Sequence, residues 1–425
     1  MVRLIITAFL ALFLIVCSGQ QNPSNSMKRN PTSACPIVQQ IDSLMQLKIF
    51  EITEKQKSDL RKPATNENAG LPDMFYEYIF TQLNRETPID LEFNEHVRKY
   101  ITIFTIDRKD EIAKMIGLSK LYFPLFEQQL DQHQLPFELK YLAMVESALN
   151  PLAVSPSGAV GLWQFKMNTA ELLQLNVTSY IDDRMNPFKS TEAACDYFDY
   201  LYRTFNDWTL VIAAYNGGPG EIRNAIERSG GKTDFGEIRE YLPEQTKNYV
   251  PAFIAMNYVM ANYQKHGIVP VLPDIFYYQT DTVQTSQPLT FQQISEVIGT
   301  PVDIIKFLNP MYRMEFIPES DQPATIILPS DKVVAFLEFE NKIYANYKEQ
   351  DDYNTLVAKA GSTENKIKIV HIVKKGEYFH KIAIKYNCSV ENIKAWNGLT
   401  DQTIYPGQRL VIWVNKREYK KHISN

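Results

Sequence analysis

The stretch LPFELKYLAMVESALNPLAVSPSGAVGLWQF, residues 135–165, organises the rest of this chain. Its first half predicts a helix in which four residues share one face: Leu139, Leu142, Ala143 and Glu146. That face is apolar except for the carboxyl group of Glu146. Burial disfavours the charged form of a carboxyl group, so we expect the pKa of Glu146 to be raised. A carboxyl group that stays protonated near neutral pH can act as a general acid.

The ends of this helix and the loops around it can also be predicted. Pro136 suits a first helical turn, and Asn150-Pro151 predicts the helix end. The small-residue loop 155–161 contains two glycines, which let backbone approach a ligand closely. Leu162-Trp163-Gln164-Phe165 then places an amide beside aromatic rings, and we expect a second small-residue loop at 214–220. An acid, amides, phenols and open loops are groups that a sugar-binding site uses.

Three motifs, in this order, resemble those of the soluble lytic transglycosylase family: Glu146-Ser147, Gly161-Leu162-Trp163-Gln164 and Ala214-Tyr215-Asn216. Four longer segments are similar to the membrane-bound lytic transglycosylase D subgroup: residues 121–127, 135–151, 157–165 and 241–253. The resemblance covers about residues 70–265. It implies a mainly α fold class, with a lysozyme-like, all-helical catalytic domain over residues 70–268 and its motifs within 120–265.

The resemblance also implies an enzyme of cell-wall remodelling that cleaves the β-1,4 bond between N-acetylmuramic acid and N-acetylglucosamine in peptidoglycan. Glu146 is the implied catalytic acid, and then the base that takes the proton from the muramoyl C6 hydroxyl group. That hydroxyl attacks C1 and leaves a 1,6-anhydro ring, without water, a second carboxylate or a cofactor. Substrate binding is implied for Ser147, Gln164, Tyr215, Asn216 and Tyr249, of which Tyr249 borders the acid.

Two other functions are compatible with the sequence. A lysozyme-type hydrolase of the same fold, such as a goose-type lysozyme, needs a second acid, for which Asp182, Asp183 and Glu171 are candidates by availability alone. A non-catalytic wall-binding protein would rely on its C-terminal modules, and the intact Glu146 argues against it. An isolated glutamate at a helix end is more often exposed or paired with arginine than catalytic.

The first residues are expected to direct export. Residues 1–17 have the features of a signal peptide, because a positive end precedes an apolar run that is too short to span a bilayer. Leu14-Ile15-Val16-Cys17 resembles a lipoprotein cleavage box, which makes Cys17 a candidate lipidation site and membrane anchor. Ordinary cleavage just after Gly19 is the alternative. Residues 18–69 are expected to form a stalk with one helix, and the predicted location is the periplasm, at the outer membrane if Cys17 is lipidated.

The C-terminal third predicts small α+β modules. A strand, two helices and a strand are expected within residues 367–415, where HIVKKGE and IYPGQRLVI resemble a LysM module, a binder of glycans that contain N-acetylglucosamine. The resemblance implies glycan binding at Gly376, Glu377, Tyr378, Tyr405, Pro406 and Gly407.

An earlier copy of this module lies at a fixed offset of 88 residues. Six residues recur without gaps: Phe291, Ile294, Val302, Ile305, Lys306 and Asn309 return as Phe379, Ile382, Val390, Ile393, Lys394 and Asn397. Residues 274–330 are therefore predicted to form a divergent LysM-like domain, with strands at 276–279 and 326–328. Its Pro288 stands where the later copy has Gly376, which predicts a structural or weakly binding module. Residues 336–366 are predicted to link the two copies.

Composition limits the partners. The chain of 425 residues, 45% hydrophobic and 22% charged, indicates ordinary globular protein in two or more domains. A net charge of −5 gives no basic face for nucleic acid. The four cysteines and six histidines show no metal-ligand spacing, so neither a metal nor another cofactor is expected. The expected partner is the glycan strands of peptidoglycan, bound by a monomer.

Overall fold

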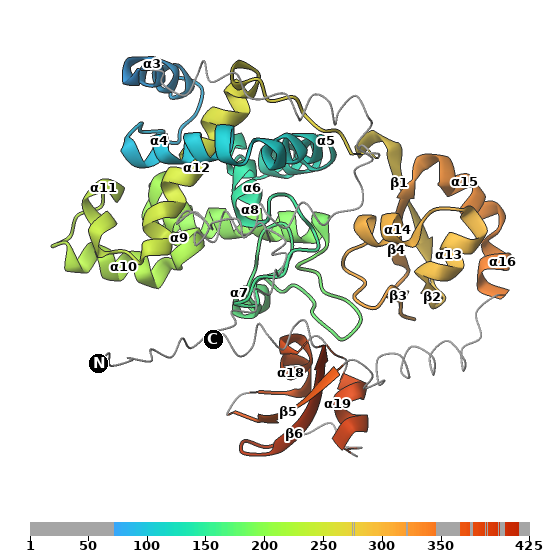
Figure 1. The fold of residues 1–425 in the computed structure, drawn as a ribbon. Helices are drawn as coiled ribbons and strands as arrows, with labels where there is room; N and C mark the ends of the chain where they lie inside the picture. The colour runs from blue at the N-terminus through green and yellow to red at the C-terminus, as the bar shows by residue number, and fades with distance from the viewer. Residues whose placement is uncertain are drawn as a thin grey trace, which may run out of the picture.

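In this computed structural model, the described residues are 72–345 and 366–415, apart from 274, 276, 320, 321, 375, 376, 387, 389, 398 and 400–403. A helical domain, residues 72–272, precedes two small α+β modules, the middle module (residues 277–345) and the C-terminal module (residues 366–415) (Figure 1). The predictions for the signal peptide, the stalk and Cys17 lie outside the described residues. Within the described part, no helix is long and apolar enough to cross a membrane.

The helical domain confirms the predicted fold class. Its elements are α3 (Asp73–Leu83), α4 (Glu95–Thr102), η4 (Ile103–Asp107), α5 (Lys109–Gln132), η5 (Phe137–Lys140), α6 (Tyr141–Ser147), α7 (Met167–Leu172), α8 (Pro187–Phe205), α9 (Trp208–Gly217), α10 (Pro219–Arg228), α11 (Phe235–Ile238), η6 (Arg239–Tyr241), α12 (Glu244–Asn262) and η7 (Tyr263–His266). The last long helix, α12, packs against α4, α6 and α9 and buries both Phe253 and Met256. Asn186 and Asp207 cap α8 and α9 through their side chains, which fixes where these two helices begin.

Three helices have features that the local sequence does not indicate. α5 is continuous, although it contains both Gly117 and Pro124. The backbone of Val271 crosses α5 at Gly117. A Cβ at Gly117 would lie 1.8 Å from the carbonyl oxygen of Val271, so the crossing requires glycine. The predicted loop at 214–220 is wrong in its first half, since α9 continues to Gly217 and ends at Gly218, with φ of 86°. α7 starts at Met167, and no side chain caps this start.

The middle module contains two small two-stranded sheets packed with helices. Its elements are η8 (Tyr277–Gln279), β1 (Thr280–Thr285), β2 (Leu289–Thr290), α13 (Phe291–Ile298), α14 (Val302–Leu308), β3 (Phe316–Ile317), β4 (Ala324–Pro329), α15 (Ser330–Glu338) and α16 (Glu340–Ala345). β1 and β4 pair antiparallel, from Thr280 opposite Pro329 to Thr285 opposite Ala324. The strand predicted at 276–279 therefore begins later, at Thr280. The predicted linker from 336 is also wrong over its first ten residues, because α15 and α16 bury Phe336 and Ile343 in the core of this module.

The C-terminal module has the predicted order of strand, helix, helix and strand. Its elements are β5 (Lys366–Ile372), α18 (Phe379–Lys385), α19 (Val390–Asn397) and β6 (Arg409–Asn415). β5 and β6 pair antiparallel, from Lys366 opposite Asn415 to Ile372 opposite Arg409. A small apolar core, which includes Phe379, lies between this sheet and the two helices.

The two copies of the repeat share one asparagine, Asn309 or Asn397, that makes the same hydrogen bonds in each. In the middle module, Asn309 Nδ2 donates to the carbonyl of Ile327 at 2.7 Å, while Asn309 Oδ1 accepts from the Ile327 N–H at 2.8 Å. In the C-terminal module, Asn397 makes the same two bonds to Val411, at 2.8 and 2.7 Å. Each asparagine also donates to the carbonyl four residues earlier. The side chain at the end of the second helix thus fastens that helix to the last strand in both copies.

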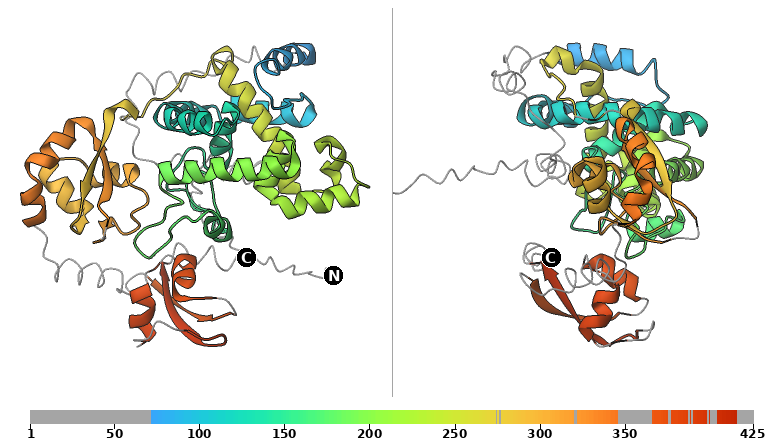
Figure 2. Two further views of the ribbon diagram at one scale, coloured as in Figure 1. Left: turned by 180° about the vertical axis from the view of Figure 1, so that it is seen from behind. Right: turned by 90° about the vertical axis from the view of Figure 1, so that its right-hand side faces the viewer.

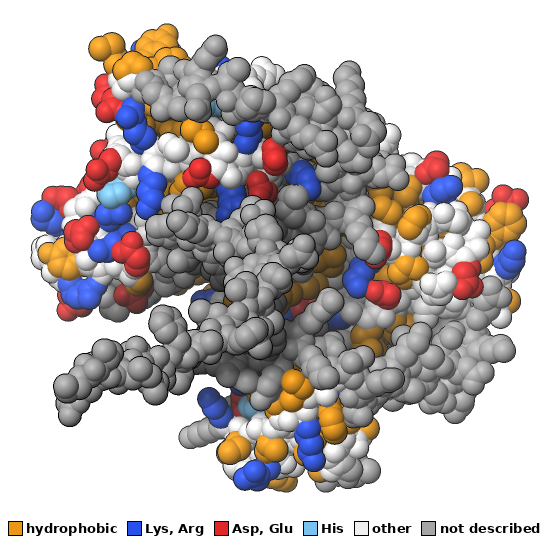
Figure 3. Space-filling model, viewed as in Figure 1, with side chains coloured by type: hydrophobic (Ala, Val, Ile, Leu, Met, Phe, Trp, Pro, Cys, Tyr) orange, Lys and Arg blue, Asp and Glu red, His pale blue; other side chains and the backbone are white. Residues whose placement is uncertain are grey.

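The modules differ in their position beside the helical domain. The middle module lies alongside it, and the C-terminal module lies below α7 in the views of Figures 1 and 2, where Tyr378 donates to Glu171 of α7. On the face drawn in Figure 3, positive and negative side chains intermix over the helical domain.

Candidate active site

The carboxyl group of Glu146 lies in the last turn of α6. The hydroxyl group of Tyr249, from α12, donates to Glu146 Oε1 at 2.6 Å. Burial raises the pKa of Glu146 to about 7, against the lowering effects of that hydrogen bond and of the nearby Lys166 charge. Burial and the Glu146 charge raise the pKa of Tyr249 well above its usual value, so the phenol stays neutral and remains a donor. A large share of Glu146 is therefore protonated at neutral pH, as a general acid requires.

The backbone after Glu146 is strained. Ala148 and Leu149 have φ of 55° and 60°, a left-handed conformation that non-glycine residues rarely adopt. Each such residue costs on the order of 1 kcal/mol or more, and strained residues gather at functional sites. α6 therefore ends at Ser147, before the Asn150-Pro151 stop that the sequence predicts. The sequence offers no signal for this ending because neither residue is glycine.

Ser147 fastens α6 to the loop 153–165. Its hydroxyl group lies 2.8 Å from the carbonyl of Leu162 and 3.0 Å from that of Ala143. The residue has an exposed fraction of 0%, so it has no surface in this structure with which to contact a glycan. Orientation of the Glu146 carboxyl group therefore fits the position of Ser147 better than the direct substrate binding that the resemblance implies.

Gln164 stands at a tight turn of the same loop. Its φ of 50° is again left-handed, and its Nε2 donates to the carbonyls of Gly161 and Ala153 at 2.8 and 3.3 Å. Gly161, with φ of 81°, lies against the backbone of Arg184, where an added Cβ would come within 2.0 Å of the carbonyl oxygen. The small residues thus allow a tight loop, and the loop defines the position of Gln164.

Tyr215 and Asn216 reach this region from the end of α9. The hydroxyl group of Tyr215 donates to the carbonyl of Trp163 at 2.7 Å, and burial raises its pKa well above the usual value, with Glu146 as the next cause. Asn216 Oδ1 accepts from the Thr246 hydroxyl group at 3.0 Å. Trp163 itself is fully buried, and its Nε1 donates to Thr191. The three separated motifs therefore converge, and Trp163 belongs to the core beneath them.

Comparison with known families adds independent evidence. The family described as "Transglycosylase SLT domain" matches residues 124–237, which include Glu146, Gln164 and Tyr215. The "Lytic transglycosylase MltD, LysM-like domain" matches residues 279–345, and the "LysM domain" matches residues 371–413. This chain carries a transglycosylase SLT domain followed by LysM modules.

Known lytic transglycosylases are similar to this chain over different lengths. The membrane-bound lytic murein transglycosylase D of Escherichia coli (strain K12) is 27% identical over 342 residues, which cover 79% of this chain and 72% of that protein. The soluble lytic murein transglycosylase of the same organism is 30% identical over 141 residues, 32% of this chain and 22% of that protein. Among solved structures, the 70-kDa soluble lytic transglycosylase of Escherichia coli has 25% sequence identity and a TM-score of 0.31, covering 40% of this chain and 27% of that chain.

The candidate second acids of a hydrolase each accept hydrogen bonds from other side chains of the protein. Both carboxylate oxygens of Asp182 accept from Arg184, at 2.9 and 2.7 Å, in a buried ion pair. Asp183 accepts from Lys189 at 2.9 Å and from the backbone of Asn176 at 3.1 Å. Glu171 accepts from the hydroxyl group of Tyr378 at 3.0 Å. The buried, ion-paired carboxylates of Asp182 and Asp183 are poorly suited to activating a water molecule. Among the described residues, no cluster of potential metal ligands occurs either.

The predicted glycan-binding residues of the LysM domain lie in two places. Glu377 Oε2 accepts from His371 Nε2 at 2.8 Å and from the Lys374 N–H at 2.6 Å, so this carboxylate holds the module together. Tyr378 and Tyr405 are 43% and 68% exposed, which leaves aromatic faces open to a sugar. Pro406 and Gly407 form the turn beside Tyr405, with φ of 88° at Gly407, and Gly376 lies outside the described residues.

Proposed function

We propose that this peptidoglycan lytic transglycosylase cleaves the β-1,4 bond between N-acetylmuramic acid and N-acetylglucosamine and leaves 1,6-anhydromuramoyl ends. The class of enzyme follows from the SLT domain and the similarity to lytic murein transglycosylases. The observation that carries the reaction is Glu146, a carboxyl group with a pKa near 7 bound by Tyr249 in that domain.

One carboxyl group serves both steps of this reaction. Protonated Glu146 gives its proton to the glycosidic oxygen as the bond to C1 breaks, and the resulting carboxylate takes the proton of the muramoyl C6 hydroxyl group. The C6 oxygen then bonds to C1, so atoms and charge balance without water. Tyr249 supports the carboxylate through its hydrogen bond, which favours the charged form. The occupied carboxylates of Asp182 and Asp183 support this scheme over a pair of catalytic acids.

The other predicted residues would act around this carboxyl group. Gln164 and Asn216 supply amides near the muramoyl sugar, and Tyr215 holds the Trp163 carbonyl in place. Ser147 orients Glu146 through its link between α6 and the loop. The LysM modules would keep the enzyme on peptidoglycan, with Tyr405 as an exposed sugar contact. The chain acts in the cell envelope after export, and lipidation of Cys17 would anchor it to the membrane.

Mass spectrometry of muropeptides released from purified peptidoglycan tests this function. The wild-type protein should release anhydromuramoyl products, and Glu146→Gln should release none, because its amide cannot donate and recover a proton in the same way. Tyr249→Phe removes the hydrogen bond to Glu146 and should retain reduced activity. Reducing-end products, heavier by one water, would establish a hydrolase in place of a transglycosylase. Binding to the wall without release would leave only a wall-binding protein.

A further inference from the structure

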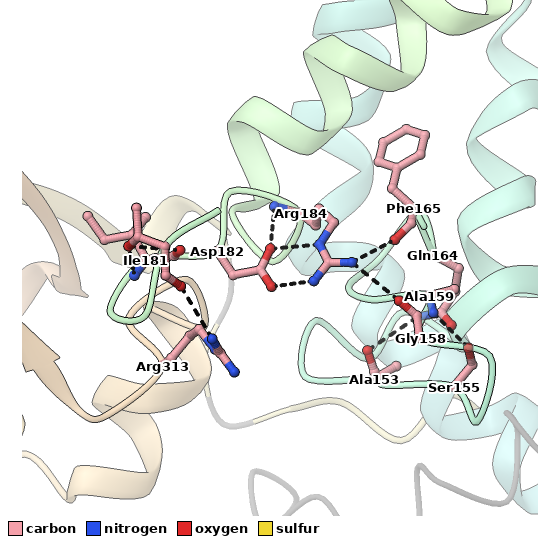
Figure 4. Close-up of polar contacts among 11 residues, drawn as sticks. Ala153, Ser155, Gly158, Ala159, Gln164, Phe165, Ile181, Asp182, Arg184 and Arg313 are labelled. Atoms are coloured by element: carbon pink, nitrogen blue, oxygen red, sulfur yellow. Dashed lines mark hydrogen bonds and ion pairs between the residues drawn. The ribbon is translucent and has the colours of Figure 1, made fainter. Parts of the chain in front are cut away.

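The middle module is bonded to the helical domain through the segment 176–184. An antiparallel bridge joins Ile181 to Tyr312, and the backbone N–H of Asp182 donates to the carbonyl of Met311 at 2.9 Å. Ile181 also packs against the apolar core of the module. The segment therefore continues the backbone pairing of the middle module while it belongs to the SLT domain (Figure 4).

Arg313 of the middle module strengthens this attachment twice. Its backbone N–H donates to the carbonyl of Tyr180 at 2.9 Å, and its guanidinium group donates to the carbonyl of Thr178 at 3.3 Å. The rings of Tyr180 and Phe316 meet edge to face, with centroids 5.8 Å apart. Polar and aromatic contacts thus fix both ends of the turn at 178–181.

The opposite side of the segment holds the loop 153–165. Arg184 is fully buried and forms a two-pronged ion pair with Asp182. Its remaining Nη1 reaches the carbonyls of Gly158 and Phe165, at 3.2 and 3.3 Å (Figure 4). A buried guanidinium group requires this full set of acceptors, so the pair and the two carbonyls depend on each other. Phe165 directly follows Gln164, so Arg184 acts on the turn that carries the Gln164 side chain.

We infer that Arg184 is a positioning residue for the Gln164 loop, and that the middle module is part of the catalytic unit because it holds the segment from which Arg184 projects. This inference rests on the proposed function for its activity readout. The module would then change turnover without being a main glycan-binding module. Arg313 bonds to the segment 176–184, and Arg184 at the end of that segment bonds to the loop 153–165.

Two substitutions test this inference in the full chain. Arg313→Ala removes the guanidinium contact from the outer side, and Arg184→Lys keeps the charge beside Asp182 but loses the fork that reaches two carbonyls. The matched control, Lys306→Ala, breaks an ion pair with Glu315 that lies within the middle module. We expect both test variants to lower kcat about three- to tenfold with KM and wall sedimentation nearly unchanged, and the control to match the wild type. Assays run well below each measured Tm.

Amide hydrogen exchange supplies a readout that does not need activity. In both test variants, exchange should accelerate in residues 153–165, whose N–H groups at Ala159 and Gly161 are bonded within the loop, and stay unchanged in α12. Faster exchange with no product from any variant would contradict the proposed function and leave the positioning contact standing. A lower Tm with unchanged exchange and kcat would overturn the inference, as would a loss of wall sedimentation with kcat intact.

Discussion

The two LysM modules of this chain have one fold and opposite relations to the enzyme. Each fastens its second helix to its last strand with an asparagine, Asn309 or Asn397. The middle module, however, contributes Phe307 and Leu308 to the apolar core of the helical domain. The C-terminal module has an apolar core made of its own residues, and it meets the helical domain through polar contacts such as that of Tyr378 with Glu171. A shared core indicates a shared unfolding unit, whereas a separate core indicates independent stability.

The two modules also differ at the position of Tyr378. The position of the exposed Tyr378 is occupied in the middle module by Thr290, which caps α13 through a reciprocal bond with Gln293. One copy has thus kept an aromatic ring open to solvent, and the other uses the position to begin a helix. A repeat in the sequence therefore predicts a repeated fold, but it does not predict a repeated role.

Deleting one module at a time should give the largest measurable difference between the two modules. Deletion of residues 274–345 removes Phe307 and Leu308 from the helical core and the strand partner of segment 176–184, so we expect the Tm to fall by about 10 °C or more. Deletion of residues 366–425 should shift the main transition by less than about 2 °C. Differential scanning calorimetry on both proteins measures the difference. Equal shifts in the two deletions would contradict the idea of a shared core.

The paired asparagines allow a finer version of the same test. Asn309→Ala and Asn397→Ala each orphan a backbone N–H and C=O of the last strand, which should cost about 4 kcal/mol in the affected module. Asn309→Ala should also lower turnover, because the middle module supports the active site. Asn397→Ala should lower wall binding and leave kcat on soluble glycan fragments unchanged. Chemical denaturation and sedimentation measure these effects, and a loss of kcat in both variants would remove the distinction.

The dependence of stability on pH should differ in sign between the two regions. The pKa of Glu146 is raised to about 7, so the folded state binds more protons than the unfolded state between about pH 4.5 and 7, and stability falls as pH rises through that window. The free energy of unfolding of Glu146→Gln should therefore exceed that of the wild type at pH 8, by roughly 3 kcal/mol for the full pKa shift. Turnover of the wild type should decline above about pH 7, because the general acid is then deprotonated.

The C-terminal module should respond in the other direction. Burial raises the pKa of Glu377, but the bonds from Lys374 and His371 together outweigh it and leave the pKa lowered. The stabilisation from this carboxylate is complete above its unfolded pKa and is lost as pH falls through the folded pKa. Thermal scans from about pH 3 to 8, followed by calorimetry and by exchange in each region, should show the helical domain losing stability above about pH 4.5 and the C-terminal module losing stability below about pH 4.5. Parallel trends in both regions would contradict the assignment.

Much of the fold and the central carboxyl group could be predicted from the sequence. Helical spacing found the face that ends at Glu146, two segments that resemble LysM found the C-terminal module, and six recurring residues found the middle module. The sequence missed Arg184, because an arginine beside two aspartates resembles an exposed charged turn until tertiary contacts bury it. It also gives no sign that α5 runs unbroken through Gly117 and Pro124, or that Gly117 packs against the backbone of Val271. The roles of Gln164, Asn216 and the other binding residues stay predictions.

The pair of left-handed residues after Glu146 has a consequence for the design of more robust variants. Glycine at Ala148 or Leu149 would remove the strain of φ values of 55° and 60°, because glycine adopts them without a steric penalty. Substitutions of this kind are commonly used to stabilise proteins. The same pair ends α6 directly behind the acid, so a looser ending would let the carboxyl group drift from Tyr249. This is a site where heat resistance and catalytic speed are expected to compete, and where selection for durability alone would lead away from an effective enzyme.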